Sequence, residues 1–338
     1  MRYSSRLFLY APLLVLAVLA VAAGLRWQSV AGGLEKWLQQ HNGHEIAPGV
    51  TLHFASETVS GFPFNVDVLL KYLSIRVKTE HTSASWHTDA FALHELTFGR
   101  SQQIYEAAGA QTFSWTDVEG SAHHFVFVPG SLQASAILSQ GRLARFDLDV
   151  NGIGSKDISG ARAQLHFRKA PDRDAIEFVA VADHLHLSPA LQAGFGADLH
   201  HVAIAGKFSP STAFIPLFEG QEAWDRTAEA WRNNRGVLNL AELNMDWDHM
   251  QIRARGDIHL NGKHRLDGTA NLHIEDSRNT YTPDVSAGRF AQALVRLRKV
   301  AREEPREISA NITSGVINLR VTNSQQIIES AGTIEPIY

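Results

Sequence analysis

Histidine is the residue type whose number and spacing first point to chemistry in this chain. The sequence contains seventeen histidines, and His184 and His186 stand two positions apart. On a β-strand, alternate side chains share a face and successive residues rise by about 3.3 Å, which would place the two rings ~7 Å apart. Together with His200 or His201 on a neighbouring strand, they could bind zinc or copper. Other histidines fall on polar positions of alternating segments, so we favour a solvated surface over a metal site and predict no cofactor.

Two carboxylates at alternate positions are the second candidate for chemistry. Asp246 and Asp248 flank Trp247, and His249 follows. The paired acids of glycoside hydrolases lie about 5–9.5 Å apart, a separation that this spacing permits. The same pattern arises wherever a core tryptophan has solvent-exposed neighbours. A hydrolase that uses these acids, or a metal on the paired histidines, is therefore the least favoured interpretation, and we predict a protein that is not an enzyme.

Composition and absent motifs exclude several classes of function. The chain has no cysteine, which excludes disulfides, thiolate catalysis and Cys-ligated metal centres. It also has no G-x-S-x-G motif, no P-loop and no dinucleotide-binding glycine motif. A net charge of −4 over 338 residues gives no general attraction to nucleic acid, so we expect no nucleic-acid partner.

An uncharged apolar run opens the chain. Residues 7–25 contain no charge and are flanked on both sides by arginine. About 20 apolar residues suffice for a helix to cross the hydrocarbon core of a bilayer, and arginines ahead of such a helix favour a cytoplasmic N-terminus. We therefore predict that residues 1–26 form a single-pass anchor in an inner membrane, with the main domain in the periplasm. A cleaved signal that ends near residues 20–22 stays open as the alternative.

The next segment, residues 27–48, is predicted to hold an amphipathic helix and a linker. Apolar residues recur at helical spacing over residues 27–40, among them Trp27 and Trp37. These tryptophans could rest at the membrane interface or pack on the first strands. The sequence leaves both places open.

From residue 49 the apolar period changes from helical to alternating. Alternation of polar and apolar residues is typical of antiparallel strands with one buried and one solvated face. We therefore predict a mainly β protein with a few helices, in two β regions, 49–208 and 209–338. Asn151-Gly152 and Asn261-Gly262 are predicted as two-residue hairpin turns. The alternating segments are 73–78, 145–150, 161–168, 252–260, 266–274 and 317–321.

Part of this pattern occurs twice. Residues 144–152 resemble residues 254–262, and residues 159–167 resemble residues 267–274. Common ancestry of two β halves would explain both matches, and so would convergence on the same hairpin chemistry. We favour two duplicated β halves.

Two helices are predicted to interrupt the strands, at residues 216–234 and 285–304. Pro216 suits a first helical turn, and Gly236 and Pro305 suit the ends. Cations on the second helix could contact anionic lipid head groups or face solvent. The cations predicted to contact head groups are Arg289, Arg296 and Lys299.

So few helices cannot cover a flat sheet of this many strands. The sheet must curl and pack on itself or leave an apolar trough open, and we expect curved antiparallel sheets with such a trough. The side chains predicted to contact an apolar ligand there are Leu165, Phe167, Ile258, Leu260, Leu272 and Ile274.

A short motif, Gly61, Phe62, Pro63 and Phe64, carries a resemblance to a known family. The chain resembles an uncharacterised bacterial envelope family, domain of unknown function 2125, which has one N-terminal apolar segment, a Gly-aromatic-Pro-Phe motif and later strand–turn–strand blocks with tryptophan. The motif also suits a kinked edge strand, because proline removes a donor from the ladder. The resemblance implies an exported, membrane-tethered bacterial protein and supplies no activity.

More distantly, the one-sided strands are similar to those of large AsmA-type envelope proteins, a resemblance that implies lipid carriage by a curved sheet. We therefore predict a non-enzymatic, membrane-anchored periplasmic protein of envelope maintenance that binds lipid or another apolar ligand in its trough. The expected partners are the inner membrane, lipid and other envelope proteins. A structural, protein-binding module of the cell envelope stays open as the alternative.

Overall fold

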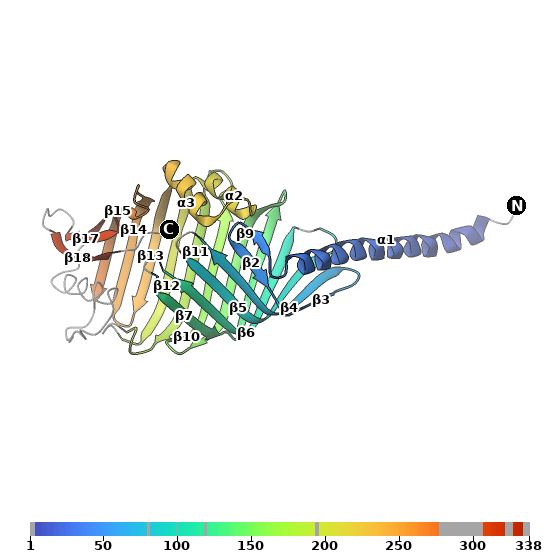
Figure 1. Ribbon diagram of the computed structural model, residues 1–338, viewed down its shortest axis with the longest axis horizontal. Coiled ribbons are helices and arrows are strands. Elements are labelled where there is room, and N and C mark those ends of the chain that lie inside the picture. The colour runs from blue at the N-terminus through green and yellow to red at the C-terminus, as the bar shows by residue number, and fades with distance from the viewer. Residues whose placement is uncertain are drawn as a thin grey trace.

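The computed structural model describes residues 4–79, 82–99, 101–117, 120–192, 196–276, 307–321 and 327–333. A long helix projects from one end of an elongated, curved sheet, and short helices lie along one side of it (Figure 1). The predicted architecture, mainly β and antiparallel behind an N-terminal apolar helix, is confirmed. The helix predicted at residues 285–304, with Arg289, Arg296 and Lys299, lies outside the described residues.

The described residues form one sheet of 18 strands, and the paired strands are antiparallel throughout. In chain order, the strands are β1 (Glu45–Ala47), β2 (Val50–His53), β3 (Ser56–Ser60), β4 (Asn65–Lys78), β5 (Ser83–Leu96), β6 (Gln102–Thr116), β7 (Ala122–Val128), β8 (Ser131–Ser139), β9 (Arg142–Ser155), β10 (Ile158–Lys169), β11 (Ile176–Leu187), β12 (Asp198–Ser209), β13 (Val237–Trp247), β14 (Met250–Leu260), β15 (Leu266–Asp276), β16 (Glu307–Thr313), β17 (Val316–Val321) and β18 (Ile327–Thr333).

Strands that follow one another in the chain also lie side by side along most of the sheet. From β9 to β18 the pairing follows chain order. Nearer the N-terminus, β2 and β3 both pair with β4, and β7 and β8 both pair with β6 and β9. Because β12 pairs directly with β13, the sheet has no division between the predicted regions 49–208 and 209–338.

The two Asn-Gly pairs do not form the predicted two-residue turns. Asn151 and Gly152 lie inside β9, where the Gly130 amide donates to both of their carbonyl oxygens, at 2.8 and 3.0 Å. The positive φ of Gly152, 64°, serves this close approach, because a Cβ there would lie 3.3 Å from the Gly130 nitrogen. An Asn-Gly pair with a positive φ at the glycine therefore marks an irregularity inside a strand here, and not a turn.

Asn261-Gly262 does lie between β14 and β15, but within a longer connection that covers residues 261–265. The Asn261 side-chain oxygen accepts hydrogen bonds from the backbone amides of Lys263 and Arg265, at 2.8 and 3.1 Å. An asparagine side chain that bonds the following backbone stabilises a wider turn than the predicted one.

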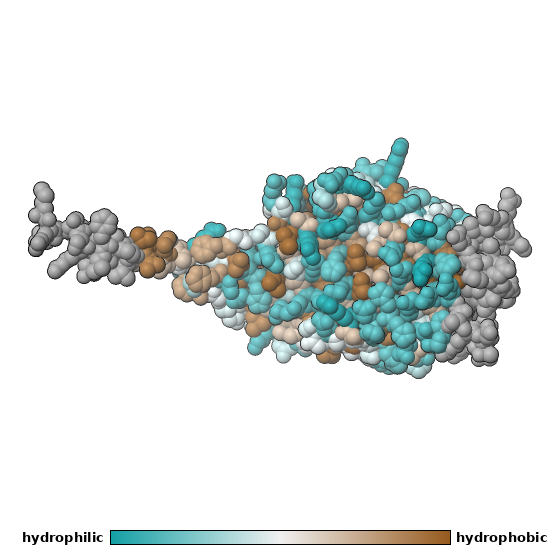
Figure 2. Space-filling view, turned by 180° about the vertical axis from the view of Figure 1, so that it is seen from behind, coloured by the Kyte–Doolittle hydropathy of each residue, from teal (hydrophilic) through white to brown (hydrophobic). Residues whose placement is uncertain are grey.

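Helix α1 (Ser4–His41) is continuous through the predicted boundary at residue 26. Its first part projects away from the sheet and exposes apolar side chains (Figure 2), and the helix is long and apolar enough to span a membrane. Its second part packs on β3 and β4, where Trp27 Nε1 donates to the Asn65 carbonyl oxygen at 2.7 Å. Trp27 therefore takes the second of its two predicted places, on the first strands, while Trp37 stays 41% exposed.

The helix predicted at residues 216–234 is divided. It is replaced by a 3₁₀ helix, η1 (Ser211–Phe214), and two helices, α2 (Ile215–Phe218) and α3 (Trp224–Asn233). Gly220, with a φ of 68°, turns the chain after α2. We call residues 211–233 the helical cap.

The helical cap covers the ends of several strands. Phe214 and Trp231 form a buried core with Leu260, and side chains near the ends of β11, β12, β13 and β15 pack against it. Gly236 follows α3 as predicted, and the close packing requires it, since a Cβ at Gly236 would lie 2.2 Å from Trp231 Cδ2. Only a residue without a side chain fits between α3 and β13.

Asp174 attaches the cap to the end of the β10–β11 hairpin. Its carboxylate accepts hydrogen bonds from Ser211 Oγ at 2.6 Å, from the Thr212 amide at 2.9 Å and from Thr212 Oγ1 at 2.8 Å. The bond from Ser211, with those from Thr212, lowers the pKa of Asp174 below its usual value. The carboxylate therefore stabilises the fold above the pKa of an unfolded aspartate, about 3.9, and this stabilisation is lost as the pH falls through the lowered pKa.

We expect Asp174→Ala to lower the free energy of unfolding at pH 7 by about 1 kcal/mol or less, because the bonds resemble those of a helix cap but are exposed to solvent. The difference from the unmodified protein should shrink as the pH falls through the lowered pKa. Thermal unfolding of the full chain in detergent, followed by circular dichroism at pH 7 and at a pH below that pKa, measures this difference. The control is Asp172→Ala, at an exposed residue that makes no hydrogen bond or ion pair with the described residues. An equal loss of stability in both variants would contradict the role of Asp174.

Candidate functional site

One face of the sheet carries a row of directly opposed, mostly apolar side chains, which we call the central row. Each member lies opposite the next across a strand pair, from β3 to β16. At the ~4.8 Å spacing between strands, the row is roughly 60 Å long. In strand order it consists of Val59, Val68, Leu93, Tyr105, Ala134, Leu148, Leu165, Ala180, Ile204, Leu243, Ala254, Leu272 and Ile308.

The two ends of the central row are covered and its middle is not. Val68 is 2% exposed in a core with α1, and Ile308 is fully buried. Every member from Leu93 to Leu272 is only half-buried. Leu93 also packs against the core at α1, and Leu243 and Leu272 pack against a second core that contains Ile308. The members from Tyr105 to Ile204 belong to none of the buried cores of the described residues, so this middle part of the row is the least covered.

The predicted ligand-contacting residues divide into two groups. Leu165 and Leu272 belong to the central row, Phe167 lies on the same face between Phe146 and Phe178, and Ile258 is also half-buried. Leu260 and Ile274 are core residues instead. Leu260 lies under the helical cap, and the fully buried Ile274 packs in a second core of the sheet, so neither is accessible to a ligand.

The opposite face carries cross-strand pairs of histidine and aspartate. His94 lies opposite Asp67, His166 opposite Asp147 and His201 opposite Asp183, and each Nδ1 is 2.7 Å from a carboxylate oxygen. Directly opposed polar pairs of this kind stabilise one register, and a slip by one residue would exchange the two faces. These pairs therefore hold the apolar face on the other side.

Asp147 shows the electrostatics of this polar face. Partial burial acts to raise its pKa, but the hydrogen bonds from His166 and Arg145 outweigh that effect and lower the pKa below its usual value. Asp147 is therefore a carboxylate at neutral pH. It is engaged by two partners on the polar face and is not a free acid for catalysis.

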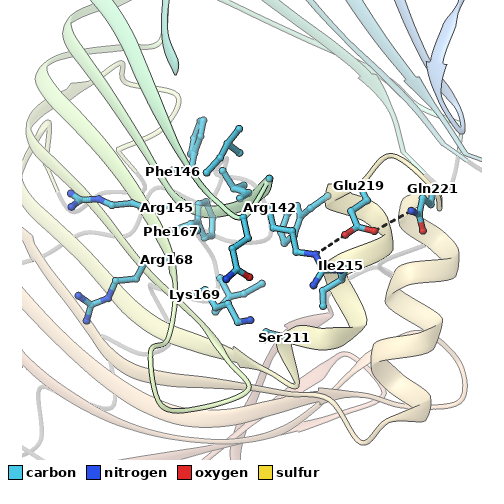
Figure 3. A pocket seen from close by; sticks show the side chains of 17 residues that line it. Arg142, Arg145, Phe146, Phe167, Arg168, Lys169, Ser211, Ile215, Glu219 and Gln221 are labelled. Carbon is cyan, nitrogen blue, oxygen red and sulfur yellow. Dashed lines mark hydrogen bonds and ion pairs between the residues drawn. The ribbon is translucent and has the colours of Figure 1, made fainter. Parts of the chain in front are cut away.

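A cavity of about 570 Å³ lies where the helical cap meets β9 and β10 (Figure 3). Phe146, Phe167 and Ile215 give it an apolar wall, and Phe146 and Phe167 are also part of the apolar face of the sheet. The volume lies within the range of small-molecule sites. The cavity therefore continues the apolar face beneath the cap.

The rim of the cavity is charged. Arg142 Nε lies 2.9 Å from Glu219 Oε1, and this ion pair joins β9 to the end of α2. Lys169 also lines the cavity, whereas Arg145 and Arg168 point away from it, across the sheet (Figure 3). Arg168 is paired with Glu177 at 2.6 Å. Lys169 has no ion-pair partner among the described residues, so its ammonium group is available to an anion.

An aromatic series leads from the cavity wall into the helical cap. Ring centroids are 6.3 Å apart between Phe167 and Phe178, 5.1 Å between Phe178 and Phe208, and 6.0 Å between Phe208 and Phe214. Phe208 also lies 6.3 Å from Trp231. Aromatic contacts at these distances rigidify the wall between the cavity and the core of the cap.

A polar cluster interrupts the apolar face near α1. Glu95 is 9% exposed and lies directly opposite Gln103, whose Oε1 accepts a hydrogen bond from the Tyr105 hydroxyl at 2.5 Å. Burial, together with the Glu95 carboxylate, raises the pKa of Tyr105 above its usual value. The tyrosine is therefore a neutral donor. This cluster and the rim residues Arg142, Lys169 and Glu219 were not predicted from the sequence, although Gln103 and Tyr105 do stand at alternate positions.

The residues predicted for hydrolase chemistry are not brought into a site. His186 is paired with Asp198 at 2.9 Å, and the described residues contain no group of three or more possible metal ligands. The exposed His184 has a positive φ of 53° within β11. Trp247 is buried, as expected for a core tryptophan, and Asp248 lies beyond the end of β13 with a φ of 51°. Asp246 and Asp248 therefore do not share a strand.

The motif of the predicted resemblance forms the turn between β3 and β4. Gly61 has a φ of 96°, and a Cβ there would lie 2.7 Å from the Asn65 carbonyl oxygen. Phe62 and Phe64 are 64% and 69% exposed. The motif therefore makes a tight turn with two exposed rings, and the alternative of a kink within an edge strand is wrong.

Comparisons with known proteins place the chain in a family and add no activity. No curated protein matches it, and no solved structure matches it. A family described as an uncharacterised protein conserved in bacteria, DUF2125, matches residues 27–323. The resemblance predicted from the sequence is thus confirmed over the second part of α1 and the strands from β1 to β17, and the chain belongs to the DUF2125 family of uncharacterised bacterial proteins.

Proposed function

We propose that this protein binds lipid acyl chains along the central row, as a non-enzymatic envelope protein held in the inner membrane by α1. The observation that carries the proposal is the half-buried, mostly apolar run of side chains from Leu93 to Leu272. Apolar surface left in water costs about 25 cal/mol per Å². A contiguous apolar face that the described residues do not cover is typical of a binding surface.

The dimensions favour several chains over one. The hydrocarbon core of a bilayer is about 30 Å thick, so the chains of one leaflet extend roughly 15 Å. The central row, at roughly 60 Å, is several times longer. A row of this length suits passage of chains along the sheet, and each methylene buried contributes about 0.8 kcal/mol wherever it lies.

The cavity rim supports an amphiphile with an anionic head group. Apolar walls at Phe146 and Phe167 suit a chain, and the Lys169 ammonium suits a carboxylate or phosphate at its end. The ion pair between Arg142 and Glu219 lies beside the rim, so its opening would widen access. Arg142 and Glu219 hold the cap to the sheet, which leaves Lys169 as the cation of the rim that can pair with a head group.

The anchor is proposed from helix α1. Between Val15 and Leu25, the exposed side chains are 55% to 64% accessible, and these include Leu16, Val18, Leu19 and Val21. A helix this apolar with no protein around it is stable inside a bilayer. We place the β domain in the periplasm, on the basis of the arginines before the helix.

A photo-crosslinking experiment tests the binding face. We expect p-benzoylphenylalanine at Leu165 or Leu272 to crosslink to phospholipid in bacterial membranes, and mass spectrometry of the purified full chain to detect the adduct. The matched control is Val179, which lies opposite His166 on the polar face and is 39% exposed. Adducts should be several-fold more abundant at Leu165 and Leu272 than at Val179.

Equal adducts at all three positions would contradict the proposal. Adducts to protein instead of lipid at Leu165 and Leu272 would favour the alternative, a structural module that binds other envelope proteins through the same apolar face.

A charge substitution tests the head-group site. We expect Lys169→Gln to weaken binding of a fluorescent fatty acid about tenfold, since a hydrogen bond to a charged group contributes about 1.5–3 kcal/mol. Binding of an uncharged analogue of the same chain length should change much less. Arg168→Gln is the control, because Arg168 points out of the cavity and pairs with Glu177. If both variants behave alike with the fatty acid, Lys169 does not hold the head group.

A further inference from the structure

The β3–β4 and β5–β6 turns, together with the residues of α1 beside them, form an exposed apolar tip at the end of the sheet. Four large apolar side chains are exposed there: Phe62 by 64%, Phe64 by 69%, Leu96 by 52% and Phe98 by 50%. The Thr97 amide donates to the Phe64 carbonyl oxygen at 2.8 Å, which holds the two turns together. We propose that this tip inserts into the interfacial layer of a lipid bilayer, the one that α1 spans.

The position of the tip along α1 sets its depth. The Phe62 ring meets the Trp27 ring edge-on, with centroids 5.5 Å apart. A Cβ on Gly24 would lie 3.6 Å from Phe62 Cε2, so the ring also lies against that residue. Gly24 belongs to the uncharged run 7–25, and Arg26 is the first residue after that run. Phe62 therefore sits at the level where the apolar part of the helix ends, which is the level of the bilayer surface when the helix spans it.

The chemistry of the tip suits that level. Aromatic side chains are favoured at the boundary between hydrocarbon and head groups, and arginine there reaches the head groups. Single exposed apolar residues are common on protein surfaces, but these four come from two adjacent turns. Their side chains continue the apolar surface of α1, whose Val21 and Leu25 are 63% and 64% exposed. Figure 2 shows this apolar surface continuing from the helix onto the narrow end of the body.

The apolar surface of the tip is continuous with that of α1, and this continuity favours lipid over protein as its binding partner. A protein partner would have to fit around a helix that enters the bilayer at the same place. Lipid surrounds that helix on all sides and needs no complementary shape. The proposal rests on the anchoring by α1 proposed above.

Insertion of the tip would also orient the sheet. The β3–β4 hairpin that carries Phe62 also carries Val59 and Val68, the first two members of the central row. A tip held in the bilayer surface therefore places the N-terminal end of the row nearest the membrane. The row then leads away from the membrane toward β16.

Single-cysteine labelling of the full chain tests the proposal, because the chain has no native cysteine. The variants are Phe64→Cys and Phe98→Cys at the tip, Leu19→Cys in α1 as a probe of the anchor, and Val128→Cys as the matched exposed control on the sheet. Leu19 is 59% exposed and Val128 54% exposed. Each variant carries the fluorophore NBD and is reconstituted in phosphatidylcholine nanodiscs with spin-labelled lipid, the nitroxide being either at the head group or deep in the chain.

We expect both tip labels to emit at shorter wavelength than the Val128 label and to be quenched best by the head-group nitroxide. The Leu19 label should be quenched best by the deep nitroxide. Adding Phe62→Ser and Leu96→Ser to Phe98→Cys should reduce the quenching of the tip label while leaving that of a Leu19 label unchanged.

Three outcomes would overturn the proposal in distinguishable ways. If the Leu19 label is quenched and the tip labels behave like the Val128 label, α1 spans the bilayer and the tip does not dock. A blue-shifted tip label that lipid nitroxides fail to quench would show that protein covers the tip, which also overturns docking to lipid. If the Leu19 label escapes quenching, the anchor itself fails, and the tip proposal fails with it.

Discussion

The cross-strand register is the constraint on which the rest of this structure depends. A strand presents alternate side chains to opposite faces, so a shift of one residue in any pair would interrupt the central row. The register is held from the polar side, where His166 and Asp147, and also His201 and Asp183, lie directly opposite each other. The polar face is thus what keeps Leu148, Leu165 and Ala180 in one line on the apolar face.

The second constraint is that few helices are available to cover the apolar face of the sheet. Helix α1 covers Val68 near one end of the sheet, and the helical cap covers Leu260 along the ends of the strands. A second core around Ile274 buries part of the face toward β16, and the members of the central row from Tyr105 to Ile204 stay half-buried outside every core of the described residues. The cavity at the cap arises where covered and uncovered parts meet, because Phe146 and Phe167 pass beneath the cap from the open face. The site and the fold therefore have one cause, an apolar face longer than the helices that cover it.

Much of the architecture could be predicted because it is local. Alternation predicts the antiparallel strands and places Leu165, Phe167 and Leu272 on the apolar face, since the period of a strand needs no tertiary information. The Asn-Gly pairs were less specific predictors of turns. Gly152 has the positive φ that its Asn-Gly pair suggested, but it uses that φ inside β9 to approach Gly130. Helical periodicity likewise continued across Gly220, where the chain turns between α2 and α3.

The sequence by itself determined the apolar helix, the two-faced strands and the family to which the chain belongs, because each depends on residues close together in the chain. The tertiary structure alone decided which part of the apolar face is covered: Leu260 and Ile274 are core residues, while Leu165 and Leu272 are only half-buried. It also decided that Phe62 meets Trp27 at the end of the apolar run, and that Lys169 and Arg142 share a rim with the cap. Burial depends on what packs above a side chain. That partner comes from a distant part of the chain, and no local pattern of residue types specifies it.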